Sequence, residues 1–120
     1  EASADNVTAA PKNIRLPEVN ASWYGFEILN VSGAYPISSF TCLIVYRELN
    51  LTKRMTMAHA TKLVNYLLYI MGEEAQGMAP DLGYAKLPDE VVKQNVEAIK
   101  DLTYNGENVY EELVPPWLRS

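Results

Sequence analysis

The sequence predicts an α/β fold in which a central apolar strand is followed by two or three helices. Residues 40–46 read FTCLIVY and are apolar on both faces, which is typical of a central strand covered on both sides of a sheet. Residues 55–71 change to the spacing of a helix with one buried stripe. Pro88 then begins a further helical pattern, because proline suits the first turn of a helix.

Three segments are expected along the chain. Residues 1–32 are predicted to be an irregular or extended amino-terminal segment, because prolines interrupt it. A strand is expected within it at residues 23–31, which are rich in aromatic and β-branched residues, with Gly25 at a bulge or at a close approach of two backbones. Residues 33–106 form the main unit, and residues 107–120 form an extended tail.

The helices of the main unit follow from periodicity and from residues that stop helices. The first helix ends at Gly72, and its predicted buried stripe consists of Ala60, Leu63, Val64, Leu67, Leu68 and Met71. A short helix at residues 73–78 stops near Pro80. In the last helix Asp89 and Glu90 face the positive end of the dipole, and Asn105-Gly106 ends it. Its buried side is expected to consist of Val92, Val96, Ile99 and Leu102 or Thr103.

The composition limits the class of protein. With 120 residues, a net charge of −5 and 48% hydrophobic residues, the chain suits one small folded domain. The acidic balance argues against nucleic acid as a partner, because phosphate backbones attract basic surfaces. The longest apolar stretch, residues 63–71, is too short to span a bilayer. Cys42 is the single cysteine, and its apolar neighbours predict a buried, inert thiol.

Two stretches resemble one family. Residues 33–45 (GAYPISSFTCLIV) are similar to the YPI motif that leads into a hydrophobic strand near the carboxy end of phosphate-binding proteins of ABC importers. Residues 82–92 (LGYAKLPDEVV) resemble the family's LGYAPLP turn into its final helix, with Lys86 where proline is common. The helix at residues 60–71 and the sequence Ala75-Gln76-Gly77 fall between the two motifs at the expected spacing, although the family usually has glycine before glutamine. The resemblance covers residues 33–104 and is weak over residues 1–32.

The resemblance implies a partial periplasmic-binding-protein-like lobe, taken from a longer two-lobed protein that closes on phosphate. It implies a non-catalytic role as part of a secreted, extracytoplasmic receptor that serves a membrane ABC permease. In that family, strands made earlier in the chain flank the counterpart of residues 40–46. An apolar strand with both edges unpaired is a strong association site. We therefore expect that the chain does not fold as a lone monomer, and that a missing segment, another chain or a homo-oligomer completes the sheet.

The sequence offers no catalytic, cofactor or metal motif, and the chain is predicted not to be an enzyme. No motif of the family's phosphate ligands occurs, so the ligand-binding residues are unknown. The hydroxyls of Ser38, Ser39 and Thr41 suit either anion binding or hydrogen bonds to backbone, and the second interpretation is favoured. His59 is the single histidine and lacks partners at metal-ligand spacing, so it is interpreted as a surface residue of the first helical turn.

The adjacent acids and the tyrosines are interpreted as structural residues and not as parts of a binding or catalytic site. The acid pairs at 73–74 and 111–112 are read as solvated charges, because neighbouring positions do not face one another on a helix. The tyrosines are read as core or edge packing: Tyr35, Tyr46, Tyr66, Tyr69 and Tyr84.

Four N-x-S/T sequons stand above what composition alone would give. They begin at Asn6, Asn20, Asn30 and Asn50, and all are expected in loops or at a strand end. They predict an N-glycosylated extracellular protein, against the alternative of coincidence in an Asn-rich chain.

Two functions stay open. The resemblance favours part of a phosphate receptor, whereas the missing ligand motif favours a subunit of an extracellular glycosylated assembly or filament that reuses a truncated fold.

Overall fold

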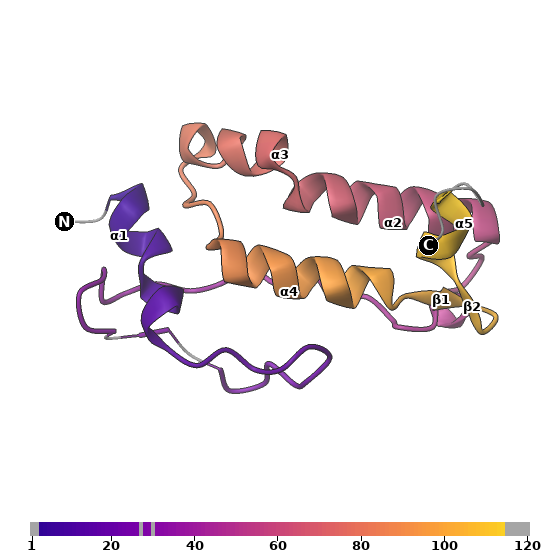
Figure 1. The fold of residues 1–120 in the computed structure, drawn as a ribbon, viewed down its shortest axis with the longest axis horizontal. Helices are drawn as coiled ribbons and strands as arrows, with labels where there is room; N and C mark the ends of the chain where they lie inside the picture. The colour runs from indigo at the N-terminus through magenta and orange to yellow at the C-terminus, as the bar shows by residue number, and fades with distance from the viewer. Residues whose placement is uncertain (1–2, 27, 30, 115–120) are drawn as a thin grey trace.

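The computed structural model describes residues 3–26, 28–29 and 31–114 of the chain, and Figure 1 shows their arrangement. The α-helices are α1 (Ala4–Thr8), α2 (Met57–Met71), α3 (Glu73–Met78), α4 (Asp89–Lys100) and α5 (Val109–Leu113). Short 3-10 helices are η1 (Ala10–Asn13), η2 (Leu49–Leu51) and η3 (Pro80–Leu82). The described sheet has two strands, β1 (Thr103–Tyr104) and β2 (Glu107–Asn108). The result is a mixed, mainly helical fold with a small sheet.

Helices α2 and α3 confirm the predicted helical period. The side chain of Thr56 caps α2 by accepting a hydrogen bond from the backbone N–H of His59 at 3.2 Å. Ala60, Val64 and Leu67 are buried on one face, four and three residues apart as a helical stripe requires. The other predicted stripe residues are partly buried against the same core: Leu63, Leu68 and Met71. Among the described residues, no helix is both long and apolar enough to cross a membrane.

Helix α4 begins as predicted and ends earlier than predicted. Pro88 precedes its first residue, and two acids occupy the first turn. The helix stops at Lys100, so the prediction that Asn105-Gly106 ends it is wrong. Those two residues instead form the turn between β1 and β2, with φ angles of 52° and 80°. Both angles suit a type I′ hairpin turn, which favours Asn-Gly because both positions need positive φ.

Two further predictions about regular structure are wrong. The tail predicted to be extended contains helix α5, which Asn108 caps by accepting a hydrogen bond from the N–H of Glu111 at 2.9 Å. The strand expected at residues 23–31 is absent from the part of it that the structure describes, where turns occur instead. Gly25 has a φ of 74° and belongs to one of those turns rather than to a bulge. Residues 115–120 of the tail lie outside the described residues.

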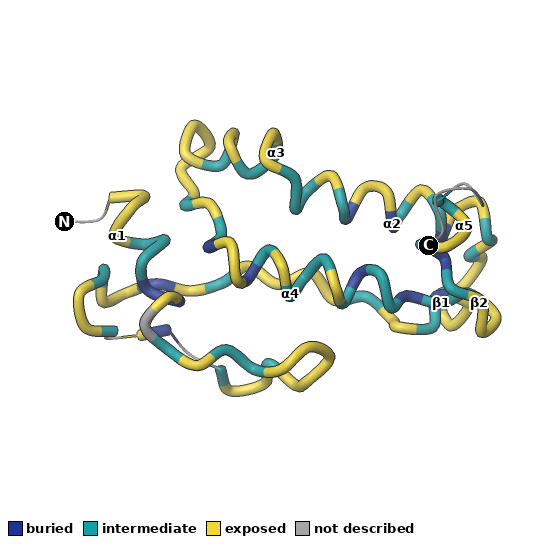
Figure 2. Tube along the Cα trace, in the orientation of Figure 1, coloured by how far each residue is buried: buried dark blue, intermediate teal, exposed yellow. Residues whose placement is uncertain are grey.

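The main buried cluster lies at one end of the molecule, and Ala10, Ile28 and Val91 are buried outside it. Helices α2 and α4 run side by side in opposite directions, and α5 packs near the start of α2 (Figure 1). Figure 2 shows how much of the remaining trace is exposed or half-buried. The buried cluster joins η2, α2, α5 and the carboxy end of α4, and its members are Leu49, Ala60, Val64, Leu67, Ile99, Leu102 and Val109.

The amino-terminal segment reaches this frame through polar contacts. The hydroxyl of Thr8 donates a hydrogen bond to the carbonyl of Lys86 at 2.9 Å. The side-chain amide of Gln94 donates to the carbonyl of Pro17 at 2.8 Å. Apart from α1 and η1, the described part of residues 1–32 has no regular element.

Candidate interaction surface

The segment from Phe40 to Tyr46, called the ribbon from here on, is the most unusual surface of the molecule. The prediction that it is a central strand is wrong for this chain, because the structure assigns no strand to it. No backbone–backbone hydrogen bond joins it to any described residue. A strand exists only where a neighbour pairs with it, so an apolar sequence alone was not sufficient.

The side chains in the middle of the ribbon face solvent. Ile44 is 97% exposed and Leu43 is 63% exposed. Tyr46 is exposed too, whereas Val45 turns inward and packs against the core. A fully exposed isoleucine loses the roughly 1.5–3 kcal/mol that burial of such a side chain contributes. The ribbon therefore presents apolar side chains together with backbone groups that have no backbone partner among the described residues, which is the combination found at an open sheet edge.

An aromatic cluster holds the amino end of the ribbon. The ring of Phe40 lies 5.7 Å from Trp23 in an edge-to-face arrangement and 6.3 Å from Phe26 in a stacked one. Trp23 and Phe26 also meet edge to face at 5.1 Å. Such pairs contribute about 0.5–1.5 kcal/mol each beyond the area that they bury. The sequence predicted these aromatics as strand residues and missed the cluster that they form.

The carboxy end of the ribbon is held by the hairpin. The N–H of Thr103 donates a hydrogen bond to the carbonyl of Arg47 at 2.9 Å, and Glu48 forms a parallel bridge with Thr103. Leu49, which follows at once, is fully buried. The aromatic cluster fixes one end of the ribbon and the β1–β2 hairpin fixes the other, so the position of its exposed middle is restrained.

Glu48 is the polar centre of this anchor. Its carboxylate accepts hydrogen bonds from the N–H of Asn105 at 2.7 Å, from the N–H of Gly106 at 2.9 Å and from the hydroxyl of Thr103 at 2.8 Å. A further bond comes from the N–H of Asn50 at 3.3 Å. These donors, Gly106 foremost, hold the pKa of Glu48 below its ordinary value, while partial desolvation opposes them. The signal that could have identified this anchor was the Asn-Gly dipeptide, a strong hairpin indicator.

The single cysteine lies within the ribbon. The prediction that Cys42 is buried is wrong, because its residue is exposed. The burial of free cysteine expected inside an apolar run depends on that run being covered, and the ribbon is not.

A hollow of about 190 Å³ lies between the aromatic cluster and the ribbon. It is smaller than the roughly 300–1,000 Å³ typical of small-molecule sites, and no basic side chain lines it. Ser38 and Ser39 reach it, but their hydroxyls donate to the backbone carbonyls of Tyr35 and Phe40. Both serines thus bond to backbone as predicted, but not at the edge of a strand, because the structure assigns no strand to residues 38–46. The lining residues are Trp23, Phe26, Ile28, Leu29, Ser38, Ser39, Phe40 and Cys42.

A second hollow, of about 440 Å³, opens between α3 and the start of α4. It contains the carboxylates of Glu73 and Asp89 beside one cation, Lys86, so its charge does not favour an anion. Gln76 crosses it, because its amide donates to the carbonyl of Ile70 and accepts from the N–H of Leu87. These contacts fix the loop before α4 and leave little polar capacity for a ligand.

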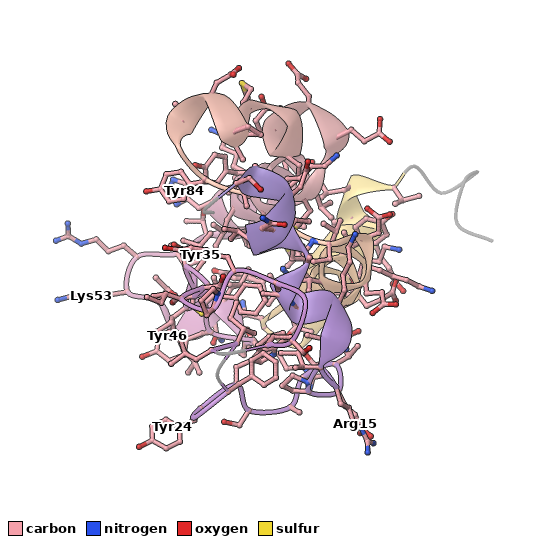
Figure 3. The ribbon with its side chains drawn as sticks, turned by 90° about the vertical axis from the view of Figure 1, so that its left-hand side faces the viewer. Arg15, Tyr24, Tyr35, Tyr46, Lys53 and Tyr84 are labelled. Carbon is pink, nitrogen blue, oxygen red and sulfur yellow. The ribbon has the colours of Figure 1, made fainter. Side chains whose placement is uncertain are left out.

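The remaining candidate residues lie on the surface. His59 is exposed in the first turn of α2, as predicted, and no metal-binding cluster occurs among the described residues. Both acid pairs are exposed. Figure 3 shows Tyr24, Tyr46 and Tyr84 directed outward. Tyr46, Tyr66, Tyr69 and Tyr84 are all exposed, so the prediction of core or edge packing is wrong for these four as regards the core, whereas Tyr35 is half-buried.

Three of the four sequon asparagines can be placed. Asn6 lies in α1 and Asn50 in η2, so the expectation of loops is wrong for these two, while Asn20 lies in a turn. All three are exposed. The side-chain amide of Asn20 donates to Asp101 at 2.7 Å, and that of Asn50 donates to the side-chain oxygen of Asn105 at 2.6 Å. Asn30 lies outside the described residues.

The molecule as a whole exposes more surface than a compact domain. Its accessible surface is 8653 Å², against about 6,500 Å² expected for a folded monomer of its mass. Its radius of gyration is 16.2 Å, against about 14 Å for a compact chain of 120 residues. The surplus of about 2,000 Å² is comparable to what one partner buries in a large permanent interface.

Comparisons of the chain with protein families, with curated proteins and with solved structures find no match.

Proposed function

We propose that this chain is the closing part of a lobe in a secreted, non-catalytic solute-binding protein of the type that delivers phosphate to an ABC importer. Phosphate and the membrane permease enter through the resemblance of residues 33–104 to that family. The ribbon then corresponds to the central strand of the lobe. Its neighbours come from outside these residues, either from the remainder of a longer polypeptide or from a partner chain.

One observation carries the proposal: an apolar ribbon is anchored at both ends and has no backbone partner among the described residues. A segment that belonged to a finished surface would bury its isoleucine and leucine or replace them with charges. The surplus accessible surface supports the same conclusion, because it provides the area that a completing element would cover.

The proposal is tested by the association of the chain itself. We expect wild-type protein to self-associate in size-exclusion chromatography with light scattering, because open edges pair with one another. Ile44→Lys places a charge in the middle of the ribbon and should raise the dissociation constant about tenfold or more, since it removes a burial contribution of about 1.5–3 kcal/mol. Tyr24→Lys is the matched control, because Tyr24 is 98% exposed and lies outside the ribbon.

The outcomes separate clearly. Weakened association in Ile44→Lys together with unchanged association in Tyr24→Lys supports an open edge at the ribbon. A compact, monomeric wild-type chain would refute it. Phosphate binding is tested by calorimetry: the isolated chain should bind none, and the longer polypeptide or the reconstituted complex should bind it. Phosphate binding by the isolated chain would mean that the site lies within these residues.

The alternative proposal is a subunit of an extracellular glycosylated assembly, and the exposed sequon asparagines favour it. In that case the ribbon joins identical chains into ordered polymers, which negative-stain microscopy would reveal. Intact mass before and after deglycosylation tests the glycans directly. Thr52→Ala removes the sequon of Asn50 without changing the asparagine, and it should lower the glycosylated mass by one glycan. An unshifted mass of wild-type protein from a glycosylating host would refute glycosylation.

A further inference from the structure

The turn between β1 and β2 holds the single Asn-Gly dipeptide of the chain, Asn105-Gly106. Both residues have positive φ angles, and both are exposed to solvent at the tip of the hairpin. Asn-Gly is the asparagine dipeptide most open to deamidation, because glycine has no Cβ to obstruct attack by its own backbone nitrogen. The chain therefore carries an intrinsically reactive site in the element that anchors the ribbon.

The reaction needs no catalyst or oxidant. The backbone nitrogen of Gly106 loses its proton and attacks Cγ of Asn105. A bond forms between that nitrogen and Cγ, Nδ2 takes up a proton from water in place of the one lost by Gly106, the bond from Cγ to Nδ2 breaks, and ammonia leaves. Water then opens the five-membered succinimide at either carbonyl, which gives an aspartate or an isoaspartate. The isoaspartate product adds one carbon to the main chain, so a two-residue turn can no longer keep its geometry.

Both participants in this reaction are held in the structure. The N–H of Gly106, which must be deprotonated to attack, donates to Oε2 of Glu48 at 2.9 Å. The N–H of Asn105 donates to the other carboxylate oxygen at 2.7 Å. The side-chain oxygen of Asn105 accepts a hydrogen bond from Nδ2 of Asn50 at 2.6 Å, which restrains the electrophilic group. We propose that Asn105 is a latent deamidation site, which Glu48 and Asn50 keep closed while the hairpin is docked.

The charge of Glu48 acts against the first step. Deprotonation of Gly106 would create an amide anion beside a carboxylate, and a neighbouring negative charge disfavours the formation of another. The same carboxylate stabilises the protonated amide as a charge-assisted acceptor. A carboxylate is also far too weak a base to remove an amide proton efficiently. Glu48 is therefore a positioning residue that slows the reaction, and the turn deamidates when the hairpin leaves Glu48.

The test is peptide mapping by mass spectrometry after incubation of the full chain at mildly alkaline pH. Glu48→Gln should deamidate at Asn105 about tenfold faster than wild type, the factor expected for the loss of one charge-assisted hydrogen bond. Glu107→Gln is the matched control, because it removes the same charge from the residue next to the turn. Wild-type protein unfolded in urea gives the rate of the unprotected dipeptide.

Each outcome decides the proposal. Faster deamidation in Glu48→Gln than in Glu107→Gln, approaching the unfolded rate, supports it. An unchanged rate in Glu48→Gln refutes protection by Glu48, and a slower rate would show that Glu48 promotes the reaction as a base. If circular dichroism shows that Glu48→Gln is unfolded, Glu48→Asp replaces it. This variant keeps the charge and withdraws the carboxylate by one methylene, and its deamidation rate must also rise.

Discussion

Removal of the side chain of Leu49 is the sharpest test of how the ribbon is anchored. Leu49 is fully buried in η2, directly after Glu48, and it belongs to the cluster shared with α2, α4 and α5. Leu51 lies two residues further along the same short helix and is 65% exposed. The two leucines share an element and differ in burial, so their truncations separate core packing from local helix effects.

We expect Leu49→Ala to lower the free energy of unfolding by about 3 kcal/mol, within the roughly 2–5 kcal/mol found for buried leucines. At about 4 °C for each kcal/mol, the midpoint of thermal unfolding should fall by roughly 12 °C. Leu51→Ala should change the free energy by about 0.5 kcal/mol or less. Urea unfolding followed by far-ultraviolet circular dichroism measures both. Equal losses in the two variants would refute the assignment of η2 to the core.

Two further predictions concern the hairpin and α5. The pKa of Glu48 is lowered in the folded state, so its carboxylate contributes stability above the unfolded pKa of about 4.3, and this contribution is lost as pH falls through the folded pKa. In Glu48→Gln the free energy of unfolding, measured by urea titration at several pH values, should therefore fall less steeply with decreasing pH than in wild type. An equally steep fall would contradict this prediction. Asn108 caps α5 and also donates to the carbonyl of Lys100 at 2.7 Å, so Asn108→Ala should cost about 1–2 kcal/mol by the same measurement. Asn65→Ala, at an exposed site within α2, should leave stability unchanged or slightly raised, because alanine favours helices; a loss equal to that of Asn108→Ala would contradict the capping role.

The helices could be predicted from the sequence because their hydrogen bonds are local. The bounds of α3 were predicted correctly, and α2 begins two residues later than expected because Thr56 caps it. Strands depend on partners distant in sequence, and this explains why residues 40–46 do not form one. The same dependence explains Cys42, whose predicted burial required a covering layer.

The candidate surface could be predicted in part. Its apolar character followed from the sequence, and the resemblance to phosphate-binding proteins led us to expect that its strand neighbours would be missing. The structure shows no backbone partner for it among the described residues. The anchors at its two ends did not follow from the sequence. The aromatic cluster requires Phe40 to meet Trp23 across a turn, and no periodicity encodes such a contact. Asn105-Gly106 is a signal for a hairpin turn as well as for the end of a helix, so the sequence does contain the information that locates the hairpin. The role of Glu48 depends on that hairpin and could not be seen without it.

The position of the main buried cluster at one end implies that the two ends of the molecule resist local unfolding unequally. Amide protons in the paired parts of α2 and α4 should exchange slowly with solvent, at a rate set by cooperative unfolding. Amides of the ribbon have no backbone acceptor among the described residues and should exchange within the shortest labelling times. A partner that adds a strand can thus reorganise the amino-terminal half while the helical end keeps its structure. Binding of such a partner would be detected as slower amide exchange in the ribbon.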